Sequence, residues 1–182
     1  MKNVVSLDTK VVNLIAIIGI FLVLLITFRS LTLPFILVFT IETAIWINLS
    51  FAYFSGLSFN FIGYLVISTV QLGATVDYAI LLTDRYIGNR KEMSKKEAMK
   101  TAIGNNIIAI ITSASILSMA GFTLALTSSN PIISELGTLL GRGTLLSFVM
   151  VACVLPAFLM LFDRAIEKTT LNNRFHNAEK ND

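Results

Sequence analysis

The sequence predicts an all-α membrane protein, folded as a bundle of five transmembrane helices. Its 182 residues are 55% hydrophobic and only 14% charged, with a mean hydropathy of +0.78, whereas soluble domains carry about 25% charged residues. The charges gather in short stretches between long uncharged runs. A bilayer selects this distribution, because a charge at its centre costs about 2.5–3.5 kcal/mol. A soluble enzyme is therefore not expected.

Five runs with at most one charge each are long enough to cross a membrane as helices. These runs are residues 11–28, 33–54, 61–83, 103–126 and 143–162. Each run must be helical, because the hydrocarbon offers its backbone amides no other partner. A stub of residues 1–10 precedes the transmembrane domain of residues 11–163, and a polar tail of residues 164–182 follows it.

Two polar stretches separate the spans in the middle of the chain. Residues 56–60 are expected to form a polar turn, and residues 84–101 a basic loop. Within that loop Ser94 and Glu97 have the spacing of a capping box, which predicts a short surface helix that begins near Lys95.

Two features mark the last span. A short interfacial helix is expected ahead of it, over residues 132–140. Pro156 lies inside the span and removes the backbone hydrogen bond to the carbonyl of Ala152, which predicts a kink at this point.

The distribution of basic residues predicts the orientation in the membrane. Five spans place the termini on opposite sides, and one side then carries eleven Lys and Arg residues against three on the other. The eleven are Arg29, Arg85, Arg90, Lys91, Lys95, Lys96, Lys100, Arg164, Lys168, Arg174 and Lys180, and the three are Lys2, Lys10 and Arg142. Because cytoplasmic loops carry the excess of positive charge, we expect a multi-pass cell-membrane protein with its N-terminus outside and its C-terminus in the cytoplasm.

Two acids within the spans, Asp77 and Glu42, are the candidate functional residues. Acids at membrane depth are rare and mark functional sites, because a carboxyl group away from water gains and loses its proton as water reaches it. Asp77 lies about 12 Å from the cytoplasmic end of its span. The spans hold no Lys or His to pair with it, and Arg142 lies near the outer end of its own span, so we favour a proton-coupled role. Glu42 lies at a similar depth and fits a functional or a hydrogen-bonded structural role equally well.

The surroundings of Asp77 support this interpretation. Thr69, Gly73 and Asp77 recur every four residues and share one helix face, where Gly73 would admit another backbone. The adjacent Tyr78 offers a hydroxyl group. Three hydroxyl residues of the fourth span lie at a matching depth, namely Thr112, Ser113 and Ser115. They fit a relay or ordinary helix–helix packing equally well.

Other chemistry is not indicated. Residues 141–144 resemble part of a nucleotide-binding loop but lack its lysine and its glycine spacing. There is no His and Cys cluster for a metal, the lone Cys153 has no disulfide partner, and the basic residues lie beside apolar runs rather than in a nucleic-acid patch. We therefore predict no catalytic residues, cofactor, metal or nucleic-acid partner, which leaves an ion gradient as the source of energy.

Four stretches resemble one family of transporters. Residues 71–86, QLGATVDYAILLTDRY, resemble the Gly-x-x-x-Asp-Tyr-(apolar)-Arg-Tyr segment of the resistance-nodulation-division (RND) transporters, in particular their MMPL branch. Residues 27–34 resemble the turn after the second helix of each transporter half, and residues 95–106 the basic loop before the fifth. Residues 143–163 resemble the closing helix, so that the resemblance covers nearly the whole chain.

The resemblance implies a fold and a function. Each half of such a transporter has six helices, and this chain with its polar tail resembles helices eight to twelve. Asp77 and Tyr78 would then belong to a proton relay that drives export of lipids, drugs or other hydrophobic compounds. The chain lacks the porter domain, the first helix of the half and a second Asp-Tyr pair, so we expect a fragment that is inactive alone.

The expected partners are the lipid bilayer, the remainder of the transporter and a hydrophobic small molecule or lipid, while homo-oligomerisation stays open. Two alternatives also stay open. One is a non-transporting assembly, scaffold or sensing module with the same fold, and the other is an accessory subunit of protein export. Asp77 favours the transporter, because a scaffold has no reason to keep an acid in lipid.

Overall fold

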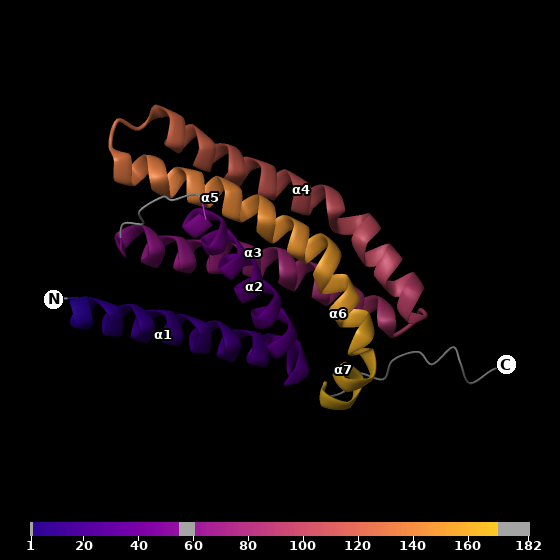
Figure 1. Ribbon diagram of the computed structural model, residues 1–182. Helices are drawn as coiled ribbons and strands as arrows, with labels where there is room; N and C mark the ends of the chain where they lie inside the picture. Colours follow the sequence, from indigo (N-terminus) through magenta and orange to yellow (C-terminus); the bar gives the residue numbers. More distant parts are fainter. Residues whose placement is uncertain (1, 55–60, 171–182) are drawn as a thin grey trace.

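The computed structural model describes the backbone of residues 2–54 and 61–170, with side chains for residues 11–51 and 68–170. The expected turn at residues 56–60 and most of the polar tail lie outside these residues. The described elements are α1 (Lys2–Phe28), α2 (Thr32–Phe54), α3 (Phe61–Arg90), α4 (Lys95–Thr127), α5 (Pro131–Val149), the π-helical turn η1 (Met150–Val154), α6 (Leu155–Leu161) and α7 (Asp163–Thr169). Helices α4 and α5 form a closely packed pair beside α2 and α3, and α1 lies at the edge (Figure 1).

Four stretches of the described helices are long and apolar enough to cross a membrane: Val11–Phe28, Thr32–Phe51, Lys95–Thr127 and Pro131–Leu161. The all-α membrane fold is therefore confirmed. The fifth expected span, residues 61–83, coincides with the first part of α3, but the side chains of residues 61–67 lie outside those described. A count of five spans therefore stays a prediction.

The helices extend well beyond the expected spans at the basic end. Helix α3 continues to Arg90 and α4 already begins at Lys95, so that only residues 91–94 of the expected loop 84–101 lie outside helices. The capping box is present, since the Ser94 hydroxyl accepts a bond from the Glu97 backbone amide at 3.5 Å. It starts the 33-residue α4 and not a separate surface helix, because charged residues alone do not end a helix that lacks an interruption by Pro.

The expected interfacial helix at residues 132–140 is part of the continuous helix α5, and glycines explain why. On α5, Gly137 and Gly141 face Gly121 of α4, where an added Cβ would lie 2.5 Å from the Gly141 backbone nitrogen. The Ser118 hydroxyl donates to the Gly141 carbonyl at 2.9 Å. Small residues spaced four apart let two membrane helices touch through their backbones, so α5 stays packed on α4 from its first turn.

The irregularity expected from Pro156 takes the form of a π-helical turn. Residues 150–154 form η1 between α5 and α6, and Pro156 follows in the first turn of α6. The wider turn accommodates the missing backbone donor. The helix axis bends there, so that α6 turns toward α7 (Figure 1).

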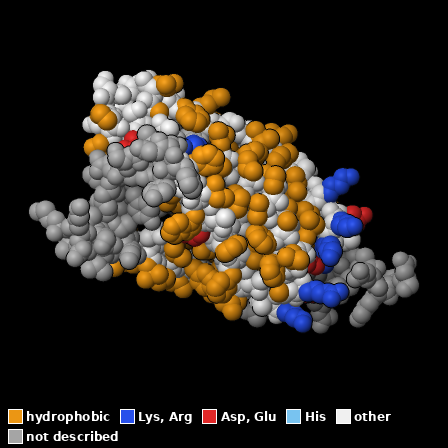
Figure 2. Space-filling model, viewed as in Figure 1, with side chains coloured by type: hydrophobic (Ala, Val, Ile, Leu, Met, Phe, Trp, Pro, Cys, Tyr) orange, Lys and Arg blue, Asp and Glu red, His pale blue; other side chains and the backbone are white. Residues whose placement is uncertain are grey.

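The core lies where α2, α3 and α6 meet, around fully buried side chains such as Leu37, Leu82 and Leu155. Outside this core the surface is broadly hydrophobic, whereas Lys and Arg gather at the end that holds the α3–α4 turn and α7 (Figure 2). We call this the basic end. A wide apolar surface bounded by charge is the surface of a protein that sits in lipid.

Candidate functional site

Asp77 and Tyr78 are neighbours on α3, yet they face different surroundings. Asp77 is exposed on the helix surface, whereas the Tyr78 side chain is 9% exposed and belongs to the core. Successive residues of a helix differ by 100° in direction, which accounts for this divergence. The pair therefore joins the interior of the bundle to one outer face.

That outer face of α3 is open. Thr69, Gly73 and Asp77 are all exposed, as their four-residue spacing predicts. Apart from its chain neighbours and the backbone of its own helix, no atom of the described residues lies within 4 Å of the position that a Cβ on Gly73 would take. Within the part of the chain that the structure describes, Asp77 forms no hydrogen bond and no ion pair. The acid and the glycine thus leave room for another element to approach.

Glu42 is half-buried on α2. Its Oε1 atom is inaccessible to solvent and has no hydrogen-bond partner among the described residues. A buried carboxyl oxygen without a partner is costly, and the described residues leave this one oxygen of Glu42 unsatisfied. Both roles considered for Glu42 stay open.

Within the described residues, none of the three hydroxyl residues of α4 hydrogen-bonds to Asp77. Thr112 is exposed, and its Oγ1 donates to the carbonyl of Ile108 in its own helix at 2.8 Å. Ser113 is also exposed, while Ser115 is half-buried. Hydrogen bonds of this kind are ordinary in membrane helices. A supporting role for these three residues therefore stays a prediction.

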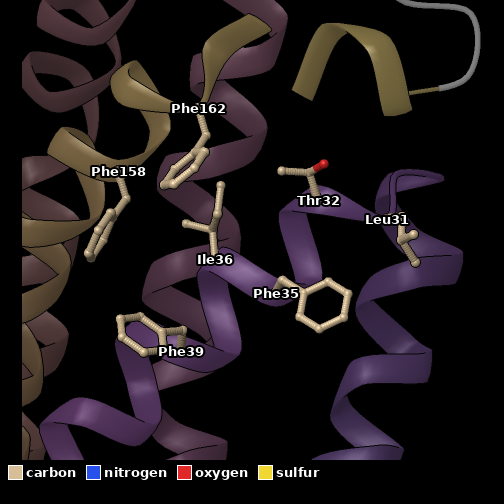
Figure 3. Close-up of a pocket in the computed structure, with 7 residues that line it drawn as sticks. All are labelled: Leu31, Thr32, Phe35, Ile36, Phe39, Phe158 and Phe162. Atoms are coloured by element: carbon tan, nitrogen blue, oxygen red, sulfur yellow. The ribbon is translucent and has the colours of Figure 1, made fainter. Parts of the chain in front are cut away.

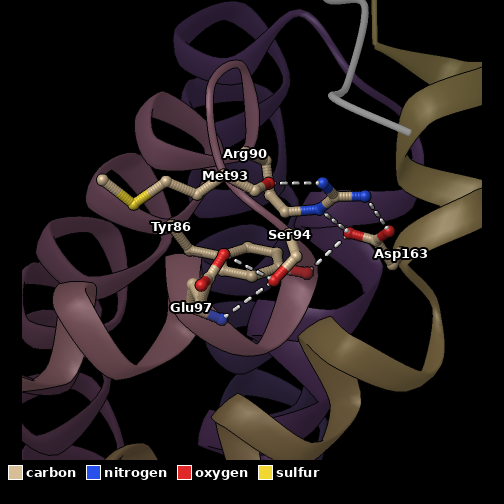
Figure 4. Close-up of polar contacts among 6 residues, drawn as sticks. All are labelled: Tyr86, Arg90, Met93, Ser94, Glu97 and Asp163. Carbon is tan, nitrogen blue, oxygen red and sulfur yellow. Dashed lines mark hydrogen bonds and ion pairs between the residues drawn. The ribbon is translucent and has the colours of Figure 1, made fainter. Parts of the chain in front are cut away.

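A charged cluster that the sequence did not reveal lies at the basic end (Figure 4). Arg90 of α3 meets Asp163 of α7 through two parallel bonds, Nε to Oδ1 at 2.9 Å and Nη2 to Oδ2 at 2.7 Å. The Tyr86 hydroxyl donates to the same Oδ1 at 2.5 Å, and Arg90 Nη1 donates to the Met93 carbonyl at 2.9 Å. The cluster fastens the end of α3 to α7 and to the turn that precedes α4.

The ion pair at the centre of this cluster is buried. The Arg90 and Asp163 side chains are 5% and 9% exposed. Burial and the bond to Asp163 raise the pKa of Tyr86 above its ordinary value, and the bond to the Asp163 carboxylate raises the pKa of Arg90. Tyr86 and Arg90 are spaced as neighbours on one helix face, but nothing local joins them to Asp163, which lies 73 residues beyond Arg90.

A second network of hydrogen bonds, which we call the amide network, was also not predicted from the sequence. Asn48 of α2 donates through Nδ2 to Gln71 Oε1 of α3 at 2.9 Å, and Gln71 Nε2 donates to Ser147 Oγ of α5 at 3.0 Å. Arg142 of α5 donates through Nε to Asn48 Oδ1 at 3.0 Å. Amide side chains within apolar spans must find hydrogen-bond partners. This rule was the signal in the sequence that could have predicted such a network.

The amide network corrects the expected depth of Arg142. Since α5 begins at Pro131, Arg142 lies about 16 Å along the helix and not near its outer end. Its Nε and Nη2 atoms donate to the side chain and the carbonyl of Asn48. Arg142 is thus held against α2, and neither of these hydrogen bonds reaches Asp77.

Comparison with known proteins gives two findings. The model of the MMPL family matches residues 1–180. The chain is also 28% identical over 164 residues to the protein ActII-3 of Streptomyces coelicolor, a match that covers 87% of this chain and 23% of that protein. The chain therefore spans less than a quarter of the length of this relative.

Proposed function

This chain belongs to the MMPL family, and we propose that it is the membrane-embedded part of an exporter that uses the proton gradient to move lipids, drugs or other hydrophobic compounds. Family membership accounts for a multi-pass membrane portion of an RND-type transporter. The energy source, the cargo and the need for the remainder of the transporter are our inference.

The observation that carries this proposal is the state of Asp77. The residue lies on an exposed face of a helix in an otherwise apolar bundle, without a hydrogen bond or an ion pair to any described residue. A permanent charge there would be costly in lipid. A carboxyl group that is neutral at one step and ionised at another meets this constraint, and it carries a proton as it changes.

The positions around Asp77 fit a relay that a second element completes. Gly73 lies one turn away on the same face with open space beside it, so a helix from the remainder of the transporter would pack there closely. Tyr78 extends from the same turn into the core. Protons would pass at the contact between this chain and that helix, which explains why the fragment would be inactive alone.

The orientation follows from the basic end. Its lysines and arginines lie where the α3–α4 turn and α7 meet (Figure 2), and the positive-inside rule assigns such an end to the cytoplasm. Asp77 would then lie about 12 Å from the cytoplasmic surface, as counted from Arg85.

The test is a neutral replacement in the complete transporter, reconstituted in vesicles with an imposed pH gradient. We expect Asp77→Asn to abolish export that depends on the gradient while protein yield is retained. Asp84→Asn is the matched control, because Asp84 is an exposed acid on the same helix at its cytoplasmic end. If Asp77→Asn exports like the wild type, the chain is a scaffold or sensing module instead.

A further inference from the structure

A hydrophobic cavity lies away from Asp77, between the start of α2 and helix α6 (Figure 3). Its volume is about 540 Å³, and four phenylalanines line it, Phe35 and Phe39 from one side and Phe158 and Phe162 from the other. Phe35 and Phe39 are 61% and 62% exposed, so the cavity opens outward. In a membrane protein that opening faces the acyl chains of the bilayer.

A rim that includes polar side chains adjoins the cavity at the basic end. This second hollow shares Leu31 with the first and is lined by Arg29, Ser30 and Thr169 together with the apolar Leu25 and Ile26. The hydroxyls form a chain, with Ser30 and Thr169 3.1 Å apart and Thr169 donating to Thr32 at 2.8 Å. Because Thr32 also lines the phenylalanine cavity, the apolar and polar parts form one continuous surface.

Arg29 is placed at this rim in an unusual way. It is exposed, and its φ of 48° makes it a left-handed residue that is not glycine. Non-glycine residues in this region are strained and cluster at functional sites. Among the described residues, the hydrogen bonding of Arg29 is confined to its backbone amide, which donates to the Leu25 carbonyl, so the guanidinium group is available to a ligand.

The charge around the rim is positive. Helix α7 adds the exposed Arg164 and Lys168 beside Glu167, while the nearby Asp163 is already bonded to Arg90. The site therefore combines an apolar cavity open to acyl chains with cations at the depth of lipid headgroups. Basic pockets between membrane helices on the cytoplasmic side are typical binding sites for anionic headgroups.

We propose that this surface binds one anionic phospholipid of the cytoplasmic leaflet. An acyl chain lies against the four phenylalanines, and the phosphate contacts Arg29 and the hydroxyls of Ser30 and Thr169. The volume is within the usual range for ligand pockets. The inference rests on the proposed function only in assigning the basic end to the cytoplasm.

The experiment compares lipid binding to the purified complete transporter by native mass spectrometry. The probes are dioleoylphosphatidylglycerol, which is anionic, and dioleoylphosphatidylcholine, which is not. We expect one phosphatidylglycerol to be retained in preference to phosphatidylcholine. Arg29→Gln should weaken its binding about fivefold, and the double variant Phe35→Ala with Phe39→Ala should weaken binding of both lipids.

Matched controls separate this site from other surfaces and from proton coupling. Lys96→Gln removes an exposed cation of α4 that lines neither hollow, and Phe122→Ala removes a phenylalanine exposed on α4, so both should bind lipid nearly as the wild type does. Asp77→Asn should also bind normally, even where it abolishes export.

Two results would overturn the proposal. Equal retention of the two lipids, unchanged by Arg29→Gln, would show that no headgroup site exists. Failure to retain either lipid, with the cavity instead protected by a segment of the same transporter in cross-linking, would show that protein and not lipid fills it.

Discussion

The fold places two aspartates in opposite surroundings, Asp163 at the basic end and Asp77 in the bundle. Asp163 is buried and accepts bonds from both Arg90 and Tyr86. Asp77 is exposed on a helix face and forms no hydrogen bond or ion pair with the described residues. One acid therefore has fixed partners, and the other has none in the described part of the chain.

The difference separates a structural acid from the acid that we propose as functional. A buried carboxylate that is fully paired holds helices in place, and removing one partner leaves the other charge stranded. An acid without a partner adds nothing to that stability, which is why we assign Asp77 to the proposed proton transfer and Asp163 to the structure.

The largest expected effect comes from breaking the charged cluster. Arg90→Met keeps the length of the side chain but leaves the Asp163 carboxylate buried without its cation. We expect a loss of about 3–5 kcal/mol in the free energy of unfolding, measured by thermal or denaturant unfolding of the complete protein in detergent. Arg85→Met is the control, since Arg85 is exposed on the same helix. Equal losses in the two variants would contradict a special role for the cluster.

A smaller loss is expected from Tyr86→Phe, which removes one bond to the same carboxylate. Hydrogen bonds to charged groups contribute about 1.5–3 kcal/mol. Because the pKa of Tyr86 is raised above its ordinary value of 10.0, the folded state favours the protonated hydroxyl. Its contribution is present below pH 10 and is lost as the pH rises further. Unfolding midpoints of the two proteins should therefore converge at high pH, and a constant gap would contradict this account.

A pair of glycines extends the comparison to packing. A Cβ at Gly143 would lie 2.5 Å from both Asn48 Nδ2 and Gln71 Oε1, whereas a Cβ at Gly73 meets open space. Gly143→Ala should therefore cost about 1–3 kcal/mol through overpacking. Gly73→Ala should leave the stability of this bundle unchanged or slightly higher and should lower transport if a partner helix packs there. Equal unfolding midpoints for the two variants would show that the amide network tolerates the added methyl group.

Local sequence signals predicted the helices well and the contacts between distant residues poorly. Uncharged runs located the apolar helices, and the Ser94 box located the start of α4. The loop at 84–101 was overestimated because charge was taken as the end of a helix, although a helix continues through charged residues in water. The depth of Arg142 was misjudged for a related reason, since the Gly137 and Gly141 contact that extends α5 depends on Gly121 of another helix.

The charged cluster and the amide network could not be predicted by considering one helix at a time. Arg90 and Asp163 lie 73 residues apart, and Asn48 and Arg142 lie 94 apart. Apolar spans predict that such groups find partners but not which partners. For Asp77 the sequence shows that the spans hold no Lys or His to pair with it. Only the fold shows that its helix face is open.

The smallest expected effect on stability is that of Asp77→Asn. With no bond to lose within the described residues, the variant should unfold within about 0.5 kcal/mol of the wild type, in contrast to Arg90→Met. The pairing of this small change with a complete loss of gradient-driven export is what distinguishes a proton carrier from a structural acid. A large loss of stability would instead mean that a cation from the remainder of the transporter pairs permanently with Asp77. In that case Asp77 would be a structural acid like Asp163, and another residue would have to carry the proton. Glu42, whose Oε1 atom has no hydrogen-bond partner among the described residues, would be the next position to replace.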